Sequence, residues 1–297
     1  MLLTLAAALT LAAAQQIDTT VPAQRGQCLQ VNAYGGDVTV RSWNRSSVRV
    51  EATTSASNRI EVSSSATTVS VRTQGRHGPP IEVGLRISVP VWMALSLSGV
   101  HTDATITGTR APISVETVEG EVKVTGGDGL ISLRSVQGSV SLQGARGRIS
   151  VNSVNEDVQV RNSTGEIMAE TVNGEIALEG VDAATVDAST VNGDISYAGP
   201  IRNGGRYSLS THNGDITLTV AEGSSATVAV STFNGEFESE FPVPLSGTRK
   251  GKGFNFTLGS GSAQVTLESF QGTIQLVRPG SAQDKERRER HDSHDDD

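Results

Sequence analysis

The sequence is poor in the residues that many binding sites use. Only 4% of its 297 residues are aromatic, and Cys28 is the single cysteine, so an intrachain disulfide is excluded. The shortage of rings argues against a platform on which nucleic-acid bases or sugars stack. The formal net charge of −8 argues further against nucleic acid as a partner, since its phosphates would be repelled.

Long hydrophobic runs and catalytic motifs are also missing. Residues 1–14 form a short apolar stretch that resembles a signal peptide with an A-x-A cleavage site, and it is too short to span a bilayer. The chain contains no nucleophile elbow, no HExxH motif and no phosphate-binding glycine loop. We therefore predict an exported, non-catalytic protein (periplasmic, cell-surface or secreted) with no catalytic residues, no metal, no cofactor and no transmembrane segment.

What the sequence does contain is a repeat. Two apolar residues separated by one other residue recur every nine positions from Leu95/Leu97 to Ile176/Leu178. Alternation with a period of two indicates a β-strand, and regular recurrence of the strand indicates a solenoid. A nine-residue step also resembles the calcium-binding β-rolls, but their glycine- and aspartate-rich pattern is absent here.

Turns of two kinds alternate between these strands. One kind reads V-x-G-[DE] and includes four Asn-Gly pairs: Asn173-Gly174, Asn192-Gly193, Asn213-Gly214 and Asn234-Gly235. We expect these pairs to be structural corners, because glycine adopts a positive φ without strain and asparagine tolerates it. The sequence thus predicts an all-β, parallel β-helix or solenoid with coils of about 18 residues and two strands per coil. An antiparallel β-sandwich is the alternative, since Asn-Gly also suits a hairpin.

The acidic residue after each corner glycine has two interpretations. Stacked coils would place carboxylates such as Asp157, Glu175 and Asp194 in one column, where like charges repel unless something compensates. A cation ladder would compensate, and so would hydrogen bonds from backbone N–H groups of the turns. We favour the second interpretation. The asparagine column is likewise interpreted as structural.

Length variation is confined to the other edge of the predicted solenoid. Insertions of this kind often mark the binding face of a repeat protein. They include residues 199–206 and 241–253, and the second of these is the most basic short stretch in the chain. We predict partner contacts from these loops at Arg202, Arg206, Arg249, Lys250 and Lys252.

The pattern divides the chain into five parts. Residues 1–14 are the signal peptide and 15–30 a linker. Residues 31–95 have irregular β-spacing and form an N-terminal β region or cap. Residues 96–279 are the solenoid repeats, and the charged, apolar-free residues 280–297 are a disordered tail.

The segments TVNGEIAL (171–178), TVNGDISY (190–197) and THNGDITL (211–218) resemble the DUF4097 family of adhesin-like bacterial envelope proteins. The resemblance implies an exported β-solenoid and supplies no catalytic residue. The function we predict is adhesin-like binding of, or scaffolding for, a surface ligand that is a protein, a glycan or an anionic lipid headgroup. The alternatives are a carbohydrate-active β-helix enzyme (lyase or hydrolase) and a passive module of an envelope-stress assembly.

Overall fold

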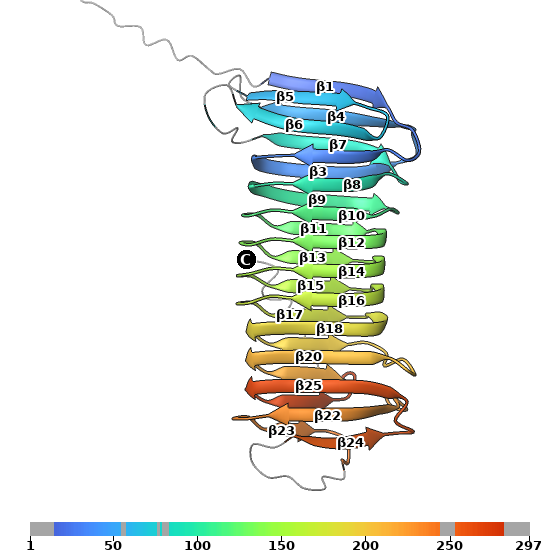
Figure 1. Ribbon diagram of the computed structural model, residues 1–297, viewed down its shortest axis with the longest axis vertical. Helices are drawn as coiled ribbons and strands as arrows, with labels where there is room; N and C mark the ends of the chain where they lie inside the picture. Colours follow the sequence, from blue (N-terminus) through green and yellow to red (C-terminus); the bar gives the residue numbers. More distant parts are fainter. Residues whose placement is uncertain (1–14, 55–57, 76–77, 79–82, 244–252, 282–297) are drawn as a thin grey trace, which may run out of the picture.

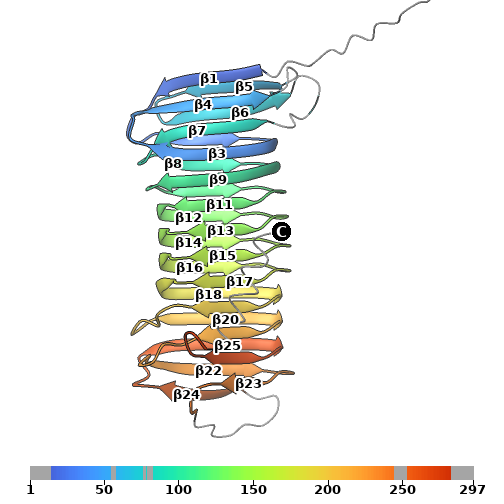
Figure 2. The same cartoon turned by 180° about the vertical axis from the view of Figure 1, so that it is seen from behind.

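The computed structural model describes residues 15–54, 58–75, 78, 83–243 and 253–281. Its strands stack into a long rod (Figures 1 and 2). In the described part no helix is long and apolar enough to cross a membrane. The predicted signal peptide, Arg249, Lys250, Lys252 and nearly all of the predicted tail lie outside the described residues.

The rod consists of two sheets of thirteen strands each. In spatial order, the first sheet contains β1 (Gln15–Pro22), β4 (Ser47–Thr54), β7 (Gly84–Pro90), β3 (Gly35–Trp43), β9 (His101–Thr109), β11 (Val122–Gly126), β13 (Val140–Gln143), β15 (Val158–Arg161), β17 (Ile176–Glu179), β19 (Ile195–Ala198), β21 (Ile216–Thr219), β26 (Ile274–Val277) and β23 (Phe237–Ser239).

The second sheet faces the first across the core. It contains β24 (Phe254–Leu258), β22 (Ala226–Thr232), β25 (Ala263–Gln271), β20 (Arg206–Asn213), β18 (Asp182–Asn192), β16 (Thr164–Glu170), β14 (Arg146–Asn152), β12 (Asp128–Arg134), β10 (Ile113–Glu116), β8 (Ala94–Ser98), β2 (Cys28–Asn32), β6 (Thr68–Gly75) and β5 (Asn58–Ser64).

In the middle of the rod, coils that follow one another in sequence also follow one another in space. β12 pairs in parallel with β10 and β14, and Ile131 lies between Ile113 and Ile149. The alternating side chains point inward, so these isoleucines are fully buried in one aliphatic ladder. The predicted parallel solenoid with two strands per coil is confirmed. The antiparallel pairs β1–β4, β4–β7, β5–β6 and β22–β24 all lie at the two ends.

Both ends of the rod are interleaved. At the first end, the coil formed by β2 and β3 lies between the coil of β8 and β9 and the coil of β6 and β7. At the other end, β25 lies between β20 and β22, and β26 lies between β21 and β23. The last coil of the chain is therefore the penultimate coil of the rod. The sequence pattern, which we interpreted as a simple succession of coils, did not predict this order.

The N-terminal segments differ from the predicted division of the chain. Residues 15–30 were expected to be a linker, yet β1 and the start of β2 fall within them. β1 pairs with β4 along its whole length, because the backbone of an edge strand gains hydrogen bonds that a linker would leave to water. Strands between residues 31 and 95 lie in the same two sheets as the repeats, and they share their continuous core.

Candidate functional site

The corner glycines are required by close packing between coils. A Cβ at Gly193 would overlap the carbonyl oxygen of Gly174, and a Cβ at Gly214 would overlap that of Gly193. Of the four Asn-Gly glycines, Gly193 has a positive φ (157°), whereas Gly174, Gly214 and Gly235 do not; the corner asparagines do not either, and Asn162 is the one non-glycine residue with a positive φ in the described part. The left-handed backbone that we expected is therefore not the general reason for Asn-Gly here. Gly174, Gly193 and Gly214 are needed because the neighbouring coil approaches too closely for a side chain at these positions, whereas the corner of the coil before Gly174 has Glu156 instead.

A column of buried hydroxyl groups supports the same corner. Thr190, three residues before Gly193, donates its hydroxyl hydrogen to the carbonyl of Gly174 over 3.1 Å. Ser135, Thr171, Thr211 and Ser269 make the equivalent bond to the coil beside them. Because these hydroxyls are buried, each one needs the partner that the neighbouring corner provides.

The corner amides form a ladder along the outside. Asn173 donates to Asn155 over 3.1 Å, Asn192 donates to Asn173 over 2.9 Å, and Asn213 donates to Asn192 over 2.7 Å. Asn234 follows Asn213 in the sequence of corners but is not its neighbour in space. Gln271 pairs with Asn213 because the last coil of the chain is inserted there.

The carboxylates of the acidic column accept hydrogen bonds from backbone N–H groups. Asp157 accepts the N–H of Glu175 over 2.7 Å, and Asp194 accepts the N–H of Asp215 over 2.7 Å. Among the described residues, no group of three or more His, Cys, Asp and Glu side chains is placed to hold a metal ion. The geometry therefore agrees with carboxylates that accept turn N–H groups.

One position of this edge faces solvent with apolar side chains. We name this column the corner stripe; its members in spatial order are Val118, Val136, Val154, Val172, Val191, His212, Phe270 and Phe233. Val118, Val172 and Val191 are more than a third exposed, although the core is rich in valine. The backbone of each coil is bonded to the next along this column, as in the N–H of Asn192 to the carbonyl of Val172. The corner stripe is thus a line of exposed and half-buried side chains, apolar except for His212, on a hydrogen-bonded edge.

The corner stripe ends in three stacked rings. The rings of His212 and Phe270 are 4.6 Å apart and nearly parallel, and those of Phe270 and Phe233 are 4.9 Å apart and nearly parallel. Phe233 is 60% exposed. Beside the rings, Ser210, Glu268 and Ser231 line a shallow depression of about 310 Å³. Two of the six phenylalanines of the chain thus lie in one surface feature.

The sequence could have indicated which residues form this stack, but not their order in space. His212, Phe233 and Phe270 occupy the position of the corner valine, so a shared location on one edge could have been found. Their order could not, because Phe270 follows Phe233 in sequence but lies between His212 and Phe233 in space.

The opposite edge carries the loops of variable length. Arg202, a predicted contact residue, forms a bidentate pair with Asp182, and this hydrogen bond lowers the pKa of the Asp182 carboxyl. Arg206 is exposed at the start of β20. The loop between them packs on the buried Tyr197 and Tyr207, and burial raises the pKa of the Tyr197 hydroxyl. In the described part, the structure therefore leaves Arg206 as the predicted contact that does not pair with an acid.

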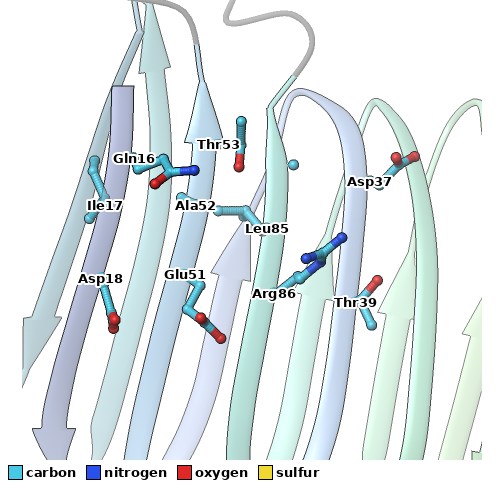
Figure 3. A pocket seen from close by; sticks show the side chains of 11 residues that line it. Gln16, Ile17, Asp18, Asp37, Thr39, Glu51, Ala52, Thr53, Leu85 and Arg86 are labelled. Atoms are coloured by element: carbon cyan, nitrogen blue, oxygen red, sulfur yellow. The ribbon is translucent and has the colours of Figure 1, made fainter. Parts of the chain in front are cut away.

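A second hollow lies on the outer face of the first sheet, near the N-terminal end of the rod (Figure 3). We name it the Gly84 hollow; it has a volume of about 380 Å³ and is lined by polar residues that include Asp37, Thr39, Glu51, Thr53 and Arg86. It extends over β1, β4, β7 and β3, and the interleaving of the first coil places β3 beside β7 there.

With this geometry established, the chain can be placed among known proteins. The family model described as Toastrack DUF4097 matches residues 26–277. The chain therefore belongs to this family, as its corner motifs suggested. No curated protein matches the sequence.

Several solved structures match this chain. A "putative adhesin" from Bacteroides fragilis is 13% identical over 90% of this chain and 99% of its own, with a TM-score of 0.47. A second "putative adhesin", from Parabacteroides distasonis, is 7% identical over 90% and 98%, with a TM-score of 0.49. A "putative lipid binding protein" from the same species is 10% identical over 88% and 96%, with a TM-score of 0.42. At these values the similarity carries no argument about function.

Proposed function

We propose that this chain is a non-catalytic binding rod of the bacterial envelope that contacts its partner through the corner stripe. The observation that supports the proposal is the exposed apolar line that ends in stacked rings. Solvent-exposed apolar side chains occur singly on most proteins, whereas a continuous line of them marks an interaction surface. Aromatic side chains contribute most to such contacts, so we expect the ring stack to dominate binding.

The hydrogen-bonded edge suits this role because it is rigid. The amide ladder and the hydroxyl column fix the backbone on both sides of the corner stripe. Binding therefore orders little backbone that was free before, and less of the interaction energy is lost to conformational entropy. The acids of this edge accept N–H groups, which favours a structural role over a catalytic one.

The proposal is tested with fluorescently labelled protein and washed envelopes of the bacterium that encodes it. Replacing Phe233 and Phe270 with serine is expected to lower the bound fraction about tenfold, because the ring stack supplies the central apolar contact. The matched control is Leu130→Ser, which removes an exposed apolar side chain (57% exposed) away from the corner stripe. Equal binding by the double variant and the wild type would contradict the assignment of this surface. Recovery of the native chain in the cytosol alone would contradict an envelope role.

A further inference from the structure

The Gly84 hollow brings together charges from four separate parts of the chain. Strand register places Asp18 beside Glu51, Glu51 beside Arg86, and Arg86 beside Thr39. Asp37 precedes Thr39 by two residues and therefore points from the same face of the sheet. Figure 3 shows the Arg86 side chain extending toward Thr39 and Asp37.

Only part of this charge is paired internally. Arg49 binds Asp18 through two hydrogen bonds of 2.9 and 2.7 Å and lies 3.1 Å from Glu51. Arg86 and Asp37 are both exposed, and neither forms an ion pair within the described residues. The hollow therefore presents one uncommitted guanidinium and one uncommitted carboxylate.

The shape of the hollow follows from Gly84. Gly84 lies between Thr53 and Asp37 and has no side chain to fill the space between them. A Cβ built on Gly84 would meet only the Thr53 carbonyl oxygen, at 3.9 Å. The space above Gly84 is open, and Thr39, Thr53 and Gln16 add hydrogen-bonding groups around it. A small polar molecule can thus lie between the two charges.

We propose that the Gly84 hollow binds an α-amino-acid zwitterion, with the ligand carboxylate on Arg86 and its ammonium group on Asp37. A guanidinium binds a carboxylate through two parallel hydrogen bonds, and a carboxylate accepts hydrogen bonds from an ammonium group. An anion alone would be repelled by Asp37 and Glu51, and a cation alone would leave the Arg86 guanidinium without a partner. A zwitterion satisfies both partners, and the hollow of about 380 Å³ leaves room for a ligand this short.

A titration of ¹⁵N-labelled protein, followed through the amides of Gly84 and Arg86, tests the inference with three matched probes. Glycine carries both charges, acetate lacks the ammonium group, and methylamine lacks the carboxylate. Glycine is expected to bind about tenfold more tightly than either half-ligand, because it makes both charge-assisted contacts. Equal affinities for the three probes would overturn the proposal, and so would tighter binding of glycylglycine, whose charges are further apart.

Three variants locate the binding. Arg86→Gln and Asp37→Asn each remove one charge and are expected to weaken glycine binding about tenfold. Gly84→Val fills the hollow, keeps both charges, and is expected to abolish binding. The control is Arg41→Gln, which removes an exposed arginine of β3 that does not line the hollow. Loss of affinity in the control equal to that in Arg86→Gln would overturn the site. The hollow and the ring stack lie at opposite ends of the rod, so failure of either proposal leaves the other intact.

Discussion

The middle of the rod and its two ends use the same strands in different ways. From β10 to β19, each coil pairs with the coils before and after it in sequence. At the ends, the first and last coils are inserted between two others. The comparison shows that coils stacked in sequence order repeat the same contacts along the rod, whereas an interleaved coil brings together residues that are distant in the sequence. Both surfaces with a proposed ligand contain such neighbours: Phe270 between two other rings, and Arg86 beside Thr39.

Interleaving should also change how stability is distributed. A solenoid with sequential coils is stabilised by contacts between nearest neighbours, which are local in the chain. The inserted coil joins strands that are distant in sequence, as β25 does with β20. Removing an end of this rod should therefore disturb more than the residues removed.

The largest effect is expected when the chain is truncated at the C-terminal end of the rod. A chain that ends at residue 240 lacks β24, β25 and β26, the described strands with which β22 and β23 pair. Residues 226–239 should then lose their hydrogen-exchange protection, while a chain ending at residue 222 keeps its protection in β18 and β20. If residues 226–239 kept their protection in the longer chain, β22 would have to dock directly on β20. This result would contradict the expected dependence of β22 and β23 on β25 and β26.

A smaller effect is expected when one buried hydroxyl group is removed, either from the middle of the rod or from its terminal coil. Thr190, in the middle of the rod, donates to Gly174, whereas the buried hydroxyl of Thr232, in the terminal coil, has no hydrogen-bond partner among the described residues. Thr190→Val should lower the free energy of unfolding by about 1–2 kcal/mol, because the Gly174 carbonyl loses its donor. Thr232→Val should change it by less than about 0.5 kcal/mol. Urea unfolding of the two variants measures the difference, and equal losses would argue against it.

The smallest expected effect is a pH dependence at the first edge strand. The hydrogen bond from Arg49 lowers the pKa of Asp18 below its ordinary value of 3.8. The contribution of this pair is therefore complete above that value and is lost as the pH falls through the lower pKa of the folded state. The protection factors of the β1 amides, which correct for the intrinsic pH dependence of exchange, should fall at pH values below 3.8 in the wild type but not in Arg49→Gln. Identical pH profiles for the two proteins would exclude this contribution.

Much of the central scaffold could be predicted from the sequence. The alternation at Ile131/Leu133 placed both residues in the core, and the repeat of about 18 residues placed the Asn-Gly corners on one edge. The role of Asn173 and Asn192 in a ladder also followed from their spacing. The reason for glycine at position 193 could not be predicted, because the distance between neighbouring coils is set only when the coils stack.

The candidate surfaces were far less predictable. We expected partner contacts on the variable edge, where Arg202 instead pairs with Asp182. The corner stripe lies on the opposite, uniform edge, because a corner valine that looks like a core residue in sequence points outward at a turn. Asp37, Glu51 and Arg86 carry no motif at all, and only the strand order makes them neighbours.

The sequence by itself therefore determined the repeat, the strands, the inward side chains and the corner chemistry. Each of these depends on residues that are close in the chain or separated by one coil. The tertiary structure alone decided the order of the coils at the two ends. Every coil offers its neighbours the same backbone hydrogen bonds and a similar aliphatic ladder, so the pattern is compatible with more than one order. The connections between coils and the antiparallel strands at the ends select the order that is observed, and with it the neighbours of Phe270 and Arg86.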